Sequence, residues 1–204
     1  MKTNVINLDN SLKEIDCAFQ EVNKFCVYQD LSEKETLRFQ LLAEEAMGIL
    51  KNIAGEFKCK FWAESTEKRC ELHFQVDTII DIQKRHDFLD ASTSGKNSAA
   101  KGIMGKVRNV MEAYMLFHDD VSKQTVMTDT SFMSYGMPSM DMAHLSASWS
   151  LHNYKTNIYE NRLNDAETEE AWDELEKSIV AKLADDVQVS IRGNKVELVV
   201  YKEF

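Results

Sequence analysis

The stretch SEKETLRFQLLAEEAMGILKNIAG, residues Ser32 to Gly55, gives the clearest helical signal in the chain. Ser32 and Glu35 have the spacing of a capping box, in which each side chain accepts a hydrogen bond from the other residue's backbone N–H. Gly55 is typical of a residue that ends a helix. Apolar residues at helical spacing predict one buried stripe along it: Leu37, Leu41, Leu42, Ala46, Ile49, Leu50 and Ile53.

Two glutamates, Glu44 and Glu45, stand in the middle of this apolar stripe. A carboxylate at such a place either lies at the wet edge of the stripe or points into a site. We expect Glu44 to lie at the wet edge. For Glu45 both alternatives are open.

Further helices and two hairpins are expected around this helix. Residues 57–63 and 70–76 alternate apolar with polar side chains, which predicts a hairpin with one buried face and one wetter face. His73 falls on the wetter face and is expected at the surface. The other expected elements are a strand over 3–8, helices over 11–28, 102–117 and 166–184, a strand over 146–154, and a closing hairpin over 187–191 and 196–200.

This order of elements predicts an α+β fold, a two-layer sandwich with helices packed on one face of a mainly antiparallel sheet. The chain has 204 residues, which fits a single domain over 1–204. Its central part has no regular pattern over much of its length. We therefore expect a long insertion at about 84–165, and long irregular segments are more often functional than inert.

Composition limits the function classes. The net charge of −10 argues against a nucleic-acid partner, which needs a basic face. No apolar run has the length of a membrane span and the N-terminal residues do not resemble a signal peptide, so we expect a cytoplasmic protein without membrane contact. The cysteines are then expected to be reduced, although Cys59 and Cys70 could face each other across the first hairpin.

Two regions of the sequence resemble the GHKL ATPase superfamily, the histidine-kinase-like ATPases, and within it the anti-sigma-factor serine kinases. One region is residues 5–77, with LSEKETLRFQLLAEEAMGILKNIAG followed by a hairpin. The other is residues 172–204, WDELEKSIVAKLADDVQVSIRGNKVELVVYKEF. The resemblance implies the Bergerat-type two-layer fold and a site for ATP and Mg²⁺.

The first motif of that family places a catalytic Glu and a Mg²⁺-binding Asn one turn apart on a helix. The resemblance assigns the Glu position to Glu45, and the Asn position then falls on Ile49, which cannot bind Mg²⁺. Asn52 lies seven residues after Glu45, close to the same helix face, and is the candidate metal ligand in place of the missing one.

The family's other motifs concern the base and the phosphates of ATP. Asp77 stands at the position of the adenine-binding Asp, but Ile79 replaces the first glycine of that motif and would crowd the base. Lys101, Gly102 and Gly105 stand where the family has a glycine-rich lid that holds the phosphates at a helix start.

These departures lead to three functional hypotheses. The first is a degenerate ATPase-like regulatory protein that acts by protein–protein contact in a bacterial signalling or sigma-factor-type switch, with a second copy of the chain as one alternative partner. The second is an active ATP-dependent protein serine kinase of the anti-sigma-factor type, with Glu45 as base. The third is a protein that binds a small ligand with the insertion at 84–165, on an ATPase-like scaffold.

Overall fold

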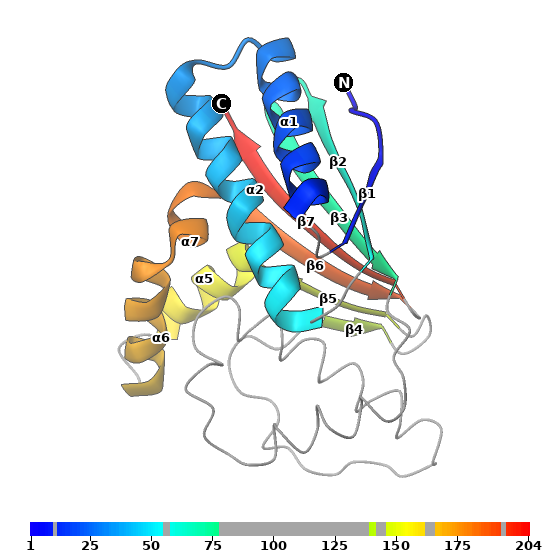
Figure 1. Cartoon of the computed structure of the whole chain (residues 1–204). Helices are drawn as coiled ribbons and strands as arrows, with labels where there is room; N and C mark the ends of the chain where they lie inside the picture. The colour runs from blue at the N-terminus through cyan, green and yellow to red at the C-terminus, as the bar shows by residue number, and fades with distance from the viewer. Residues whose placement is uncertain (10–11, 55–57, 78–138, 142–145, 162–165, 193–194) are drawn as a thin grey trace, which may run out of the picture.

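The computed structural model describes residues 1–9, 12–54, 58–77, 139–141, 146–161, 166–192 and 195–204 (Figure 1). Its helices in these ranges are α1 Leu12–Tyr28, α2 Glu33–Ala54, α5 Leu151–Asn161, α6 Ala166–Lys177 and α7 Ile179–Leu183. Its strands are β1 Ile6–Leu8, β2 Cys59–Thr66, β3 Arg69–Asp77, β4 Ser139–Asp141, β5 Ser146–Ser150, β6 Asp186–Arg192 and β7 Lys195–Glu203. The expected helix over 102–117 lies outside the described residues. None of the described helices is long and apolar enough to cross a membrane.

The described strands form one antiparallel sheet of seven strands, in the order β1-β2-β3-β7-β6-β5-β4. The two predicted hairpins meet at its centre, where β3 pairs with β7 from Arg69↔Glu203 to Asp77↔Lys195. β4 and β5, which belong to the expected insertion, extend the same sheet beyond β6. With α1 and α2 lying together against one face of this sheet (Figure 1), the predicted α+β fold class is confirmed.

The N-terminus of α2 has the predicted capping box. The Ser32 backbone N–H donates to Glu35 Oε2 at 2.8 Å, and the Glu35 N–H donates to Ser32 Oγ at 3.4 Å. The Ser32 hydroxyl also donates to Glu35 Oε2 at 2.6 Å, and these bonds hold the pKa of Glu35 below its usual value. The local sequence therefore determines where this helix begins.

The buried face of α2 differs from the predicted stripe. Leu37 is 66% exposed, so the stripe does not begin there. Phe39 is fully buried instead, with its ring 5.5 Å from that of Phe25 in α1 and 5.9 Å from that of Phe204. Among the α2 side chains that the structure describes, the buried ones are Phe39, Leu42, Ala43, Ala46, Met47 and Leu50. The partners of Phe39 lie in other elements, and they set the rotation of the helix.

The first hairpin alternates as expected, but its cysteines do not face each other. Cys59 pairs with Val76, whereas Cys70 pairs with Ser65 near the other end of β2. All four cysteines of the chain are free thiols. Burial raises the pKa of Cys59 to about 12 and that of Cys70 to about 11, so both remain protonated within the core.

Two expected elements near the C-terminal half are divided in the structure. The strand expected over 146–154 ends at Ser150, and α5 begins at Leu151. The helix expected over 166–184 is interrupted between α6 and α7 at Ser178, whose hydroxyl accepts a hydrogen bond from the Ala181 N–H at 3.2 Å and starts the second helix. In α7, Ile179 is 42% exposed, whereas its neighbour Val180 is buried.

Candidate functional site

Three of the residues assigned by the ATPase resemblance lie in described elements. Glu45 and Asn52 belong to α2, and Asp77 is the last residue of β3. Lys101, Gly102 and Gly105 lie outside the described residues, so the structure does not relate them to the other three. Glu45 is half-buried beside Ala46, which is 1% exposed, and therefore stands at the border of the core face of α2.

The topology brings two of these positions to one end of the sandwich. α2 ends at Ala54 and β2 begins at Cys59, whose partner in β3 is Val76. Asp77 is therefore at the same end of the molecule as the last turns of α2, which carry Asn52 (Figure 1). Among the described residues, no group of three His, Cys, Asp or Glu side chains could hold a metal ion. The role of Asn52 in Mg²⁺ binding stays a prediction.

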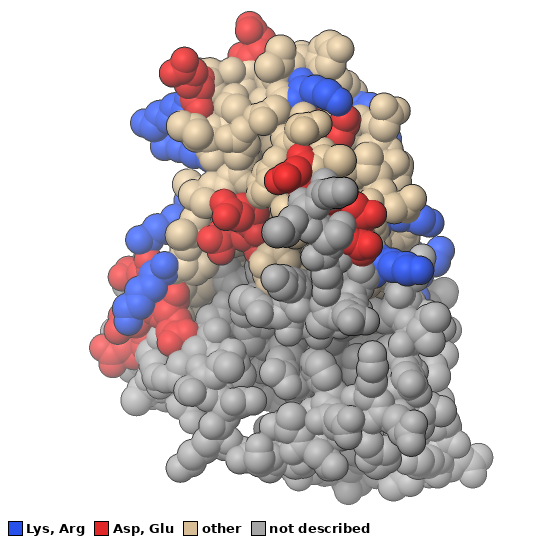
Figure 2. Space-filling model, viewed as in Figure 1, with Lys and Arg blue, Asp and Glu red and all other residues tan. Residues whose placement is uncertain are grey.

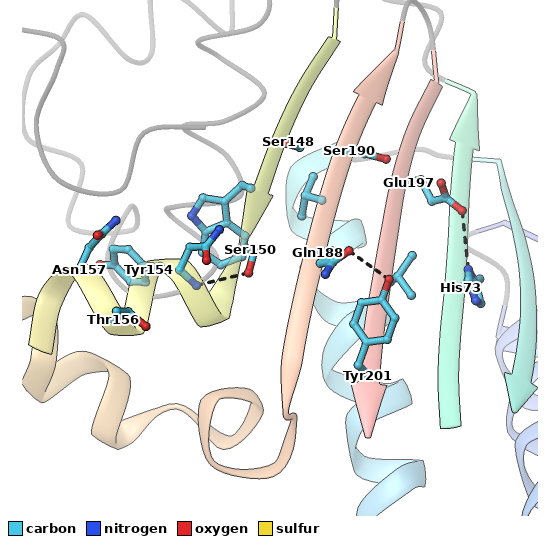
Figure 3. A pocket seen from close by; sticks show the side chains of 14 residues that line it. His73, Ser148, Ser150, Tyr154, Thr156, Asn157, Gln188, Ser190, Glu197 and Tyr201 are labelled. Atoms are coloured by element: carbon cyan, nitrogen blue, oxygen red, sulfur yellow. Dashed lines mark hydrogen bonds and ion pairs between the residues drawn. The ribbon is translucent and has the colours of Figure 1, made fainter. Parts of the chain in front are cut away.

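A second candidate site is a hollow of about 720 Å³ on the sheet face opposite α2 (Figure 3). This volume is within the usual range for small-molecule sites. β3, β5, β6, β7 and α5 all contribute to it. The described lining residues are His73, Ser148, Trp149, Ser150, Asn153, Tyr154, Thr156, Asn157, Gln188, Val189, Ser190, Glu197, Val199 and Tyr201.

The floor of this hollow follows from the alternation of the strands. In β7, Val196, Leu198 and Val200 are buried in the core, which leaves Glu197 and Tyr201 on the opposite face. The same alternation in β6 buries Val187, Val189 and Ile191 and presents Gln188 and Ser190 beside them. The sequence of the closing hairpin thus builds the core and the polar floor at once.

His73 forms one border of the hollow, and its ring lies close to Trp62, Glu71 and Glu197. Its ring stacks on Trp62, with centroids 4.7 Å apart and planes 7° apart. Nε2 lies 3.0 Å from Glu71 Oε2, and Nδ1 lies 3.6 Å from Glu197 Oε1 without a hydrogen bond. Only 13% of the side chain is exposed, so the expectation of a surface histidine is wrong.

Tyr201 stands at the centre of the floor. Its hydroxyl donates to Gln188 Oε1 at 3.1 Å (Figure 3). The guanidinium of Arg69 lies 3.9 Å from the centroid of the Tyr201 ring. Burial, and then the charge of Glu71, raises the pKa of Tyr201 above its usual value, so the hydroxyl remains a donor at neutral pH. A second hollow of about 390 Å³ adjoins the first, since Tyr201, Gln188, Ser150 and Asn153 line both.

The wall formed by α5 is fixed by Asp186, the first residue of β6. Asp186 Oδ1 accepts hydrogen bonds from the N–H of His152 at 2.9 Å and of Val187 at 2.8 Å. Ser150 Oγ donates to both carboxylate oxygens at 3.1 and 3.2 Å, and Gln188 Nε2 donates at 2.9 Å. Ser150 Oγ in turn accepts a hydrogen bond from the Asn153 N–H at 3.3 Å, so Ser150 and the distant carboxylate of Asp186 together cap α5.

α5 is also tied to the helical layer. Lys155 Nζ donates to the Ala181 carbonyl in α7 at 2.6 Å, and burial lowers the pKa of this amine. Leu151, Tyr154 and Ile158 are buried, and burial raises the pKa of Tyr154 to about 12. The α5 face that carries Asn153 and Asn157 is exposed and borders the hollow.

The side chains that line the hollow can donate and accept hydrogen bonds. Serine, threonine, asparagine, glutamine and tyrosine side chains supply most of its polar groups. Its histidine has a carboxylate near each ring nitrogen, and Nδ1 is shielded from solvent.

Sequence reasoning singled out none of these residues as a binding set. They come from positions 73, 148–157 and 188–201, and no spacing within the sequence relates these positions. The alternation of polar and apolar residues in the two hairpins indicates which side chains lie on the wetter face of the sheet. The polar side chains of the two hairpins lie together only because β3 pairs with β7, and the sequence pattern does not show this pairing.

No protein-family model, curated protein or solved structure matches this chain.

Proposed function

We propose that this chain is a regulatory protein that binds a small polar molecule in the hollow on the sheet face opposite α2. The single observation that carries the proposal is the hollow itself, which has the volume of a ligand site and a lining of neutral hydrogen-bonding side chains. Residues 148–157, which contribute half of its walls, belong to the expected insertion. This location supports the hypothesis that the insertion creates a ligand site on an ATPase-like scaffold.

An acidic surface over α6 supports the proposal that such a regulator acts on a protein partner. Acidic side chains gather over α6 on the helical face (Figure 2), and Glu169, Asp173 and Glu176 are exposed there. Such a surface suits a basic partner protein by charge complementarity. In this proposal the protein remains a non-enzymatic, degenerate ATPase-like switch that acts through protein–protein contact.

The experiment is to fill the hollow and measure ligand binding. Ser190 lies on its floor, and we expect Ser190→Trp to abolish binding of small polar fragments detected by NMR on the full chain. Thr66→Trp is the matched control, because Thr66 is an exposed hydroxyl residue of β2 outside the hollow. Retained fragment binding in folded Ser190→Trp would refute the proposal. Folding of both variants is checked by their amide spectra.

Nucleotide binding is a second proposal, favoured by the common location of Asn52 and Asp77 at one end of the sandwich. Its test is a calorimetric titration of the purified protein with a non-hydrolysable ATP analogue, with and without Mg²⁺. Binding that needs Mg²⁺ and is lost in Asn52→Ala would support the assignment of Asn52 and favour the kinase hypothesis. Absence of heat at millimolar nucleotide would contradict it.

A further inference from the structure

We infer that the hollow selects a molecule that carries a primary amine among hydroxyl groups, such as an amino sugar or an amino alcohol, with Glu197 as the group that binds the amine. This inference rests on the proposed ligand-binding function and specifies the chemical class of the ligand. Its structural basis is the negative charge of Glu197 on the floor of the hollow and the hydrogen-bonding groups around it.

Glu197 is the one carboxylate among the described residues that line the hollow, and none of those residues is Lys or Arg. Among the described residues no group donates a hydrogen bond to it, and its side chain is 38% exposed. An ammonium group offers three donors and a positive charge, which suits a carboxylate that accepts no hydrogen bond from the described residues. The net charge of −10 also favours the approach of a cation.

The neighbouring histidine makes no hydrogen bond to Glu197. Nε2 of His73 lies 3.0 Å from Glu71 Oε2 and is engaged there. Nδ1 lies 3.6 Å from Glu197 Oε1 and makes no hydrogen bond to it. Arg69, which lies in β3 with His73, interacts with Glu71 and with the ring of Tyr201.

The surrounding groups suit hydroxyls rather than further charges. Ser190 pairs directly with Glu197 across β6 and β7, and Ser148 pairs with Ser190 across β5 and β6. Gln188 and Asn157 add amide groups, which both donate and accept. A ligand with one amine and several hydroxyls would therefore find a partner for each polar group.

The test is a binding screen on the labelled full chain with matched triplets of hydroxyl-rich fragments. Each triplet contains a primary amine, the corresponding alcohol and the corresponding carboxylic acid, for example glucosamine, glucose and glucuronate. We expect the amine to bind about tenfold tighter than the alcohol, which is the size of one charge-assisted hydrogen bond at a partly exposed carboxylate. The acid is expected to bind most weakly.

Glu197→Gln should remove the amine preference, so that the amine and the alcohol bind this variant with affinities equal within about twofold. Glu160→Gln is the matched control, since it removes the same charge from α5 outside the hollow and should keep the preference. Equal binding within the triplets, or a preference that survives Glu197→Gln, would overturn this inference and leave the ligand-binding function standing. Absence of binding by every fragment, whatever its charge, would overturn the proposed function itself.

Discussion

Replacing Asp186 with alanine should release the N-terminal turns of α5. Two of the donors left without this acceptor belong to the start of α5, the N–H of His152 and the hydroxyl of Ser150. Loss of a helix-capping acceptor costs about 0.5–2 kcal/mol, and each further half-buried donor left unsatisfied costs about 1 kcal/mol. The expected cost to α5 is therefore about 2 kcal/mol, which raises its local opening about 30-fold.

Amide hydrogen exchange over residues 151–161 measures this opening directly. We expect faster exchange of α5 in Asp186→Ala and little change in β2 and β3. Asp185→Ala is the matched control, because Asp185 accepts hydrogen bonds from Lys202 Nζ at 2.9 Å and the Glu203 N–H at 2.6 Å, both in β7, and none from α5. Unchanged exchange of α5 in Asp186→Ala, or an equal increase in both variants, would refute the assignment of Asp186 as the cap of α5.

The remaining predictions concern the core. Phe39→Ala should lower the free energy of unfolding by about 3–5 kcal/mol in urea titrations, whereas Leu37→Ala should change it by less than about 0.5 kcal/mol; equal effects would contradict the rotation of α2. Alkylation of the native protein at about pH 8 should modify the exposed Cys17 and spare Cys59, which peptide mapping by mass spectrometry would reveal. The folded state keeps the Cys59 proton more tightly than the unfolded chain, so stability should fall between pH 9 and about 12, by about 1.4 kcal/mol per pH unit for this thiol; a Cys59→Ala variant with an equal slope would contradict this.

Local sequence signals predicted the parts of the fold that depend on neighbouring residues. The capping box of α2 needs only Ser32 and Glu35, and it formed as expected. The alternation of the closing hairpin likewise predicted which of its side chains enter the core. In both cases the residues that decide the structure lie within one short segment, so the pattern was readable without a fold.

The errors arose where a distant residue decides the local structure. Leu37 and Phe39 are both apolar and lie near each other in α2, and only the packing of Phe39 between Phe25 and Phe204 determines which is buried. The strand expected over 146–154 ends at Ser150, whose hydroxyl caps α5 together with Asp186, a residue 34 positions from His152. Propensity is a weak guide at such places, since tertiary contacts override it.

Sequence patterns could not predict the candidate hollow, because it is lined by residues from strands that are distant in sequence. His73 and Glu197 approach each other only because β3 pairs with β7, and α5 reaches the same place only because β5 pairs with β6. The ATPase resemblance directed attention instead to Glu45, Asn52 and Asp77, whose joint role stays a prediction.

The most direct test of the central claim is a map of amide chemical shifts on the full chain with an amine-bearing polyol such as glucosamine. We expect the shifts to concentrate in β6, β7 and α5, at residues that line the hollow, and to disappear in Ser190→Trp. Shifts confined to the last turns of α2 and the end of β3, or no shifts with any hydroxyl-rich fragment, would contradict it.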